Sequence, residues 1–210
     1  MMRISRSSIV KATSAILALA GIGLLARSVR RKYAGYDELE SVSAVDIKRY
    51  LGDWHEIARY PHRFEKGCEE VAAHYSSLAD GRIKVVNECY KGGAARRKAS
   101  IEGTARIVDD KSNAKLKVSF FWPFEGDYWI LDVGPDYEYA VVGEPRRKHL
   151  WILSRSPEMD EDVYRRLLKT IESKGYDPRR LIVSGRIKRR GDLSRRADAK
   201  SQGTSHALPN

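Results

Sequence analysis

Residues 50–59 read YLGDWHEIAR, and the run 55–58 within them is the first of about eight short strand-type segments. Turn residues separate the segments, among them Asp80-Gly81, Gly134-Pro135 and Glu144-Pro145. The remaining segments lie at 71–76, 83–87, 100–108, 115–120, 128–133, 137–142 and 149–154. Many short strands at such close spacing predict an all-β barrel or sandwich.

One helix is predicted after the strand series, at residues 161–174. Asp160 is placed to cap its N-terminus, and Gly175 follows as a stop signal. The apolar residues of this segment share one face at helical spacing: Val163, Leu167, Leu168 and Ile171. A short final strand is expected at 181–183.

The positive charge of the chain lies at its two ends. The 210 residues hold 39 Lys and Arg against 28 Asp and Glu, a net charge of +11. Seven basic residues lie in 1–32 without any acid, and seven more lie in 186–210 beside two acids. The middle of the chain, 33–185, therefore holds 25 basic and 26 acidic residues, which disfavours a nucleic-acid-binding domain.

The two ends also suggest contact with a membrane. Residues 12–26 are apolar and have basic residues on both sides, so we interpret 1–32 as a signal or membrane-anchor segment. An uncleaved anchor is favoured because the cleavage site is poor, and no Cys follows that could carry a lipid. Residues 33–44 are assigned to a linker, 45–185 to the folded domain and 186–210 to a basic disordered tail, which either contacts anionic lipid or is simply solvated.

Three short motifs resemble the signatures of the lipocalin family. They are Gly52-Asp53-Trp54 before the first strand, Asp136-Tyr137 before the seventh, and Arg155 at the end of the eighth. The longer runs 50–59, 120–124 and 150–155 resemble bacterial lipocalins of the outer-membrane lipoprotein type, relatives of apolipoprotein D. The resemblance covers residues 45–184 and implies an eight-stranded antiparallel up-and-down barrel with one C-terminal α-helix packed outside.

The resemblance also implies roles for single residues. Trp54 is expected to plug the closed end of the barrel, with Arg155 lying across its ring in a cation–π contact. Gly52, Asp136 and Tyr137 complete this structural signature.

Alternation along the strands assigns an inward face, which we expect to line a cavity for one small ligand. The predicted lining is mostly apolar with a few polar groups: Glu56, Ala58, Val71, Ala73, Tyr75, Val85, Asn87, Ile101, Gly103, Leu116, Val118, Phe120, Tyr128, Val142, His149 and Trp151. Phe64, between the first two strands, is expected to be either a lid over the mouth or an exposed loop aromatic. Two alternatives stay open. One is that these side chains fill a solid barrel core instead of lining a cavity. The other is that Glu56 forms a hydrogen bond to a neighbouring Tyr instead of a ligand headgroup.

The two cysteines, Cys68 and Cys89, bracket the first hairpin, and in an exported protein a disulfide is favoured over two free thiols. A two-residue turn at Asp80-Gly81 would pair residue 72 with 89, so a bulge or a longer loop is required. No metal or other cofactor is predicted, because the histidines lack ligand spacing. They are His55, His62, His74, His149 and His206.

Together with the apolar lining, the resemblance implies a non-enzymatic lipid carrier of the cell envelope that holds a fatty acid or a lysophospholipid close to a membrane, and we expect it to face the periplasm. One alternative, which the resemblance also suggests because a few relatives isomerise bound lipids, is an isomerase that uses a cavity thiol, for which Cys89 has the right parity. Another is a carrier of a tetrapyrrole or other pigment. The sequence leaves open whether the chain forms a homodimer.

Overall fold

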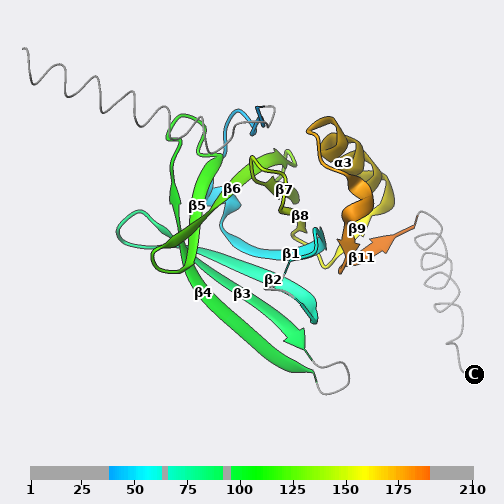
Figure 1. Ribbon diagram of the computed structural model, residues 1–210, viewed down its shortest axis with the longest axis horizontal. Coiled ribbons are helices and arrows are strands. Elements are labelled where there is room, and N and C mark those ends of the chain that lie inside the picture. Colours follow the sequence, from blue (N-terminus) through cyan, green and yellow to red (C-terminus); the bar gives the residue numbers. More distant parts are fainter. Residues whose placement is uncertain (1–37, 63–65, 92–95, 190–210) are drawn as a thin grey trace, which may run out of the picture. The chain divides into compact units, whose positions relative to one another are not determined.

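The computed structural model describes residues 38–62, 66–91 and 96–189, in which antiparallel strands β1 to β8 form a closed barrel (Figure 1). Each strand pairs with the next along the chain, and β1 pairs with β8 to close the sheet. The strands are β1 Gly52–Arg59, β2 Cys68–Ser77, β3 Ile83–Lys91, β4 Arg97–Ile107, β5 Lys115–Phe121, β6 Phe124–Val133, β7 Tyr139–Gly143 and β8 Leu150–Ser154. The predicted all-β barrel is therefore confirmed.

Helix α3, Glu161–Ser173, lies outside the barrel beside β7 and β8, as predicted (Figure 1). The Asp160 carboxylate accepts the backbone N–H of Asp162 at 2.8 Å, which satisfies one of the free donors at the helix start. The helix ends before Gly175, whose φ of 80° is costly for any residue with a side chain. A 3-10 turn, η3 Pro178–Arg180, follows the helix.

Three short strands extend the architecture beyond the barrel. Strand β10, Ile182–Val183, adds to the edge of β1, and β9, Glu158–Asp160, pairs in parallel with β11, Arg186–Lys188. The prediction that a disordered tail begins at residue 186 is wrong for residues 186–188, because their backbone is paired with β9.

The two faces of the barrel sheet bury two separate hydrophobic cores. The inner core lies within the barrel and includes Trp54, Tyr75, Val85, Leu116, Ile130, Val142 and Leu153. The outer core lies between the barrel and α3 and includes Ile57, Ala58, Leu131, Val141, Ile152, Leu167 and Ile171. On β7 and β8 successive residues alternate between the two cores, as expected for strands whose two faces are both covered.

The course of the strands defines two ends of the barrel. At the closed end lie the start of β1 and the β2–β3, β4–β5 and β6–β7 connections. At the open end lie the β1–β2, β3–β4, β5–β6 and β7–β8 connections.

The segment before β1 covers the closed end. It contains the short helix α2, Ile47–Tyr50, whose Asp46 cap accepts the N–H of Lys48 at 2.9 Å, and it buries Val45 and Tyr50 in the inner core. The N–H of Val42 donates to the carbonyl of Ile130 at 3.0 Å. The linker assigned to residues 33–44 is therefore corrected for its second half, because Leu39 and Val42 are apolar and pack against the barrel cores.

Residues 1–37 and 190–210 lie outside the described residues, and so do the predicted signal or anchor segment, most of the basic tail, and Phe64. Within the described ranges, no helix is both long and apolar enough to cross a membrane.

Candidate functional site

The closed end of the barrel is sealed around Trp54, which is fully buried. The indole N–H donates to the carbonyl of Tyr50 at 2.8 Å, and the Arg155 guanidinium lies 3.8 Å from the centre of the indole ring. The same guanidinium donates to the backbone carbonyls of Asp53 at 2.8 Å, Arg49 at 2.6 Å and Tyr137 at 3.2 Å. Arg155 therefore ties α2, β1 and the β6–β7 connection together across the floor.

The other signature residues lie around this seal. Gly52 has a φ of 93°, and a Cβ atom there would lie 3.4 Å from the Arg155 guanidinium. The Tyr137 hydroxyl accepts the N–H of Asp46 at 2.7 Å, while Asp136 lies 3.8 Å from the guanidinium of Arg49. The signature residues thus act as structural elements of the closed end.

Three tyrosine hydroxyls meet inside the closed half of the barrel. The Tyr128 hydroxyl lies 2.8 Å from that of Tyr50 and 3.1 Å from that of Tyr75. Burial raises the pKa of both Tyr50 and Tyr128 well above the ordinary value of 10.0, so these groups stay neutral at physiological pH. The hydroxyls of the cluster bond to one another, and the Tyr50 ring lies with its centre 5.0 Å from that of Trp54.

Most of the predicted lining residues do share the inward face. Strand pairing places them together: Glu56, Val71, Ala73, Tyr75, Val85, Asn87, Ile101, Gly103, Leu116, Val118, Phe120, Tyr128, Val142, His149 and Trp151. On β4 and β5 their burial decreases toward the open end. Ala105 and Leu116 are buried, whereas Val118 and Phe120 are half-buried and Ile101 is 36 % exposed. On the β1 and β2 side, in contrast, Glu56 and Val71 are buried.

The predicted inward position of Ala58 is wrong, because a bulge at Ile57 shifts the register of β1. Before the bulge Glu56 pairs with Leu153, and after it Ala58 pairs with Ile152, which faces α3. Ala58 consequently belongs to the outer core, and Arg59, opposite Trp151, takes the inward position.

The bulge brings two charges of opposite sign together on the inward face. The Arg59 guanidinium lies 3.3 Å from a Glu56 carboxylate oxygen, and only 6 % of Arg59 and 4 % of Glu56 is exposed. The same carboxylate oxygen accepts the hydroxyl of Ser184 at 2.6 Å. Strict alternation along β1 places Arg59 on the outward face, so the sequence alone could not identify it as an inward residue. The one hint in the sequence is that this charged residue directly precedes Tyr60, which the structure shows to be buried.

Aromatic side chains line the open end beside this ion pair. His149 stacks on Trp151 with ring centres 5.9 Å apart, and His62 meets both rings edge-on, at 6.0 and 5.5 Å. Burial lowers the pKa of His149 below its ordinary value of 6.5, although the nearby Glu144 raises it in part. His62 was not included in the predicted lining, since it follows β1 in a loop.

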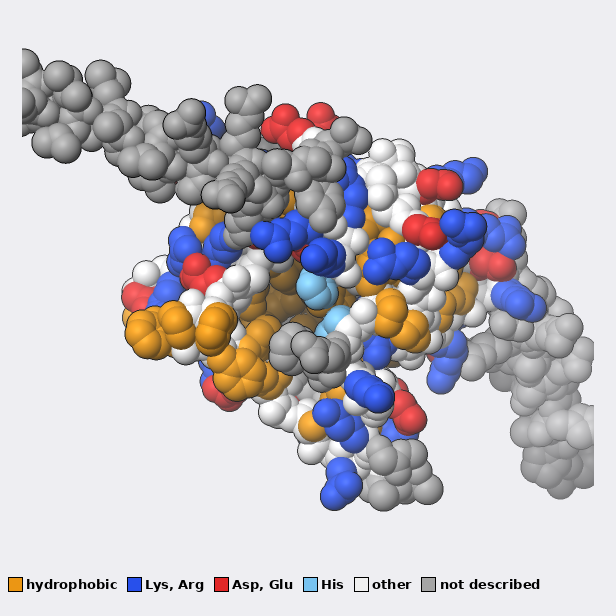
Figure 2. Space-filling view, in the orientation of Figure 1, with side chains coloured by type: hydrophobic (Ala, Val, Ile, Leu, Met, Phe, Trp, Pro, Cys, Tyr) orange, Lys and Arg blue, Asp and Glu red, His pale blue; other side chains and the backbone are white. Residues whose placement is uncertain are grey.

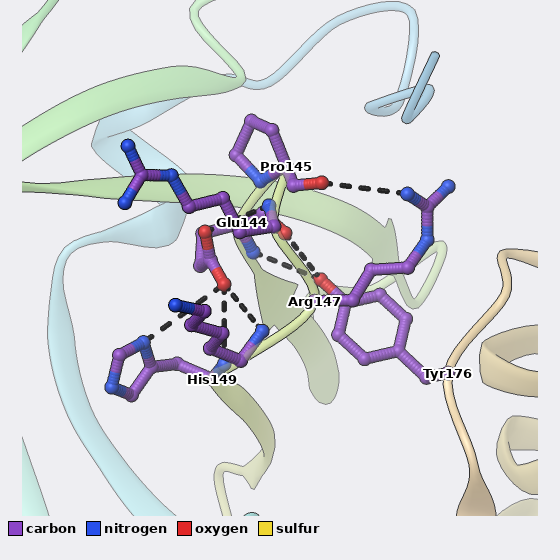
Figure 3. Close-up of polar contacts among 7 residues, drawn as sticks. Glu144, Pro145, Arg147, His149 and Tyr176 are labelled. Atoms are coloured by element: carbon purple, nitrogen blue, oxygen red, sulfur yellow. Dashed lines mark hydrogen bonds and ion pairs between the residues drawn. The ribbon is translucent and has the colours of Figure 1, made fainter. Parts of the chain in front are cut away.

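The β7–β8 connection that carries His149 is held by the buried carboxylate of Glu144 (Figure 3). This carboxylate accepts the backbone N–H groups of Arg146 at 2.9 Å, of Lys148, and of His149 at 3.3 Å. The Tyr176 hydroxyl, which follows α3, donates to the Glu144 carbonyl and accepts the Glu144 N–H, both at 2.9 Å. One side of the mouth is therefore a fixed loop.

Figure 2 shows a hollow on one face of the molecule, with apolar side chains inside it and two adjacent histidines at its edge.

The predicted disulfide between Cys68 and Cys89 is present, with Cα atoms 5.5 Å apart. The β2–β3 connection spans 78–82 rather than two residues, and a bulge between Glu69 and Ala72 supplies the register shift that the pairing requires. Both cysteines of the chain are consumed, so the thiolate needed by the isomerase hypothesis does not exist while this bond is intact. No cluster of three or more metal-ligating side chains occurs in the described part of the chain.

Comparisons with known proteins agree with this geometry. The sequence model of the lipocalin-like domain matches residues 45–185. The chain is 42 % identical over 149 residues to temperature-induced lipocalin-1 of Arabidopsis thaliana, which covers 67 % of this chain and 78 % of that protein. It is also 42 % identical over 141 residues to outer membrane lipoprotein Blc of Escherichia coli K12, covering 67 % and 79 % of the two chains.

More distant matches agree with this assignment. Bovine apolipoprotein D is 31 % identical over 152 residues, covering 68 % of this chain and 77 % of that protein. Insecticyanin from Manduca sexta has a similar structure with a TM-score of 0.58 at 20 % identity, covering 73 % of this chain and 90 % of the other. With the closed barrel, the outer helix and the Trp54–Arg155 seal, these matches show that the chain belongs to the lipocalin family.

Proposed function

We propose that this protein is a carrier that binds one single-chain lipid, a fatty acid or a lysophospholipid, inside its barrel. The observation that carries the proposal is the partial exposure of inward apolar side chains in the open half of β4 and β5. Ile101 is 36 % exposed and Val118 and Phe120 are half-buried, whereas Ala105 and Leu116, nearer the closed end of the same strands, are buried. An acyl chain would replace water against these side chains, at about 0.8 kcal/mol for each CH₂ group buried.

The polar groups of the site suggest how the lipid is oriented. The Glu56–Arg59 pair, His62 and His149 lie in the part of the interior nearest the open end, while the closed end is occupied by the tyrosine cluster. A lipid whose tail points toward Tyr128 would place its headgroup within reach of these polar side chains. Because the pair carries both signs of charge, it suits a carboxylate or phosphate at Arg59 as well as an ammonium group at Glu56.

The setting we propose is the cell envelope, with the protein held at a membrane and facing the periplasm. Two observations support it. Relatives at 42 % identity are outer membrane lipoproteins, and the disulfide of this chain is typical of an oxidising compartment.

The test is a fluorescence titration of the purified chain with lysophospholipids and fatty acids, followed by native mass spectrometry of the complex. We expect saturable binding of one lipid per chain, with a change in the emission of Trp151. Absence of saturable binding to a folded barrel would contradict the proposal. A visible absorption band in the purified protein would favour the pigment-carrier alternative instead.

The same titration assigns a role to Arg59. Arg59→Met removes the inward guanidinium, and Arg165→Met removes an exposed one on α3, outside the barrel, as the matched control. We expect weaker binding of anionic lipids by Arg59→Met, by roughly tenfold for one charged hydrogen bond, and unchanged binding by Arg165→Met. Binding that falls equally in both variants would show that Arg59 does not contact the headgroup.

A further inference from the structure

The largest exposed apolar side chains of the described residues lie together in one hairpin. Phe121 is 61 % exposed, Trp122 is 92 % exposed and Phe124 is 77 % exposed. Phe121 ends β5, Phe124 begins β6, and Trp122 and Pro123 connect the two strands; we call residues 121–124 the aromatic tip. Trp54, in contrast, is fully buried. A cluster of large apolar side chains that are more than half exposed marks a surface that contacts another partner.

The aromatic tip is held away from the barrel core by the strands that carry it. Phe120, the residue before it, packs against the inner core, and Phe121 pairs with Phe124 across the hairpin. On the outer face Arg106 of β4 makes two hydrogen bonds to the carboxylate of Glu125, at 2.8 and 2.7 Å. These contacts fix the base of the hairpin, so its aromatic side chains stay at the surface.

Positive charge surrounds the same end of the barrel. The connections and strand ends at the open end contribute exposed or half-exposed Lys66, Lys91, Arg97, Arg146 and Lys148. Figure 2 shows Lys and Arg side chains around the hollow and an apolar patch at one side of it. An exposed aromatic group at the same end of the barrel as several basic residues is the composition of surfaces that enter the interface of an anionic bilayer.

We propose that the aromatic tip inserts into a lipid bilayer that contains anionic lipid, which places the mouth of the barrel against the membrane surface. A bilayer fits better than a protein partner, because the tip is a narrow projection. A stable protein interface buries about 800 Å² on each partner over a broad patch. The docking does not depend on what the barrel binds, and it would give a bound lipid a direct path between barrel and bilayer.

The experiment measures the environment of Trp122 in the full chain, with vesicles of phosphatidylglycerol and phosphatidylethanolamine. The signal of Trp122 is the difference between the wild-type chain and Trp122→Phe, since this substitution keeps an aromatic side chain at the tip. On vesicle-bound protein we expect a blue shift of the Trp122 emission, protection from acrylamide, and quenching by brominated acyl chains. This readout is independent of any anchoring by residues 1–32, because it reports on Trp122 alone.

Two results would overturn the proposal. One is a Trp122 as accessible to acrylamide on bound vesicles as in buffer. The other is equal protection at the same protein concentration without vesicles, which would identify a second copy of the chain as the occupant.

A pair of variants provides the control. Phe124→Ser removes an aromatic side chain from the tip, while Val108→Ser removes an exposed apolar one, 44 % exposed, after β4 at the closed end. We expect Phe124→Ser to reduce the protection of Trp122 and Val108→Ser to leave it unchanged, and equal behaviour of the two would contradict insertion through the tip. Lysophospholipid binding without vesicles is measured on the same samples, so that failure of docking and failure of the proposed carrier function are distinguished.

Discussion

The closed and open ends of the barrel are built from the same strands, yet they use their aromatic residues in opposite ways. At the closed end Trp54 is fully buried, bonded to Tyr50 and covered by Arg155. At the open end Trp122 is 92 % exposed, and Trp151 and His149 are half-buried around the mouth. The difference separates two tasks: the closed end stabilises the fold, and the open end leaves apolar surface available for partners.

The largest expected effect distinguishes the two tryptophans. Trp54→Ala should lower the free energy of unfolding by about 3–5 kcal/mol, because it leaves a cavity in the inner core and removes the ring beneath Arg155. Trp122→Ala should change the free energy of unfolding by less than about 0.5 kcal/mol, because the side chain makes little contact with the fold. Urea unfolding followed by circular dichroism measures both. Comparable losses in the two variants would break the distinction between the ends.

The disulfide should have the next largest effect. It lies in the open half of the barrel, where it joins the ends of β2 and β3 nearest the mouth. The double variant Cys68→Ser/Cys89→Ser releases a loop with a sequence separation of 21 residues. We expect a loss of about 3 kcal/mol in the free energy of unfolding, mainly through the unfolded chain. A loss below about 1 kcal/mol would mean that the open end does not need this constraint.

A smaller effect concerns His149 at the mouth. Burial lowers the pKa of this side chain in the folded protein, so below pH 6.5 the unfolded chain binds more protons than the folded one. Stability should therefore be complete above about pH 6.5 and decline as the pH falls toward the lowered pKa. Urea unfolding at pH 7.5 and pH 5.5 should show a larger loss in the wild-type chain than in His149→Asn. Equal losses would indicate that the ring is as solvated as a free imidazole.

Much of the fold could be predicted because local signals and tertiary structure agree. The strand runs, the Asp160 cap and the Gly175 stop follow from residue type and spacing, and the structure confirms them. The Cys68–Cys89 pair, which the structure also confirms, was predicted from the cysteine count of an exported chain, because the turn spacing alone would have paired residue 72 with 89. The segment before β1 was the exception. Its four-residue helix has too few residues for a periodic signal, although Asp46 in front of it is a typical N-cap.

The candidate site was less predictable than the fold, for a physical reason. A bulge changes which residue of a strand points inward, and the bulge at Ile57 is fixed by pairing with β8, which lies far along the chain. Strict alternation consequently assigned Ala58 to the interior and overlooked Arg59. The exposure of the aromatic tip was also unpredictable, because alternation on β5 cannot tell where the hairpin leaves the barrel.

The most direct test of the central claim, that the open half of the barrel binds a single-chain lipid, is a lysophospholipid titration of two matched variants. Ile101→Trp adds bulk on the inward face of β4 near the mouth, and Ser100→Trp adds the same bulk to the neighbouring, outward-facing position. We expect Ser100→Trp to bind lipid like the wild-type chain and Ile101→Trp to lose saturable binding while it remains folded. Unchanged binding by folded Ile101→Trp would contradict the account.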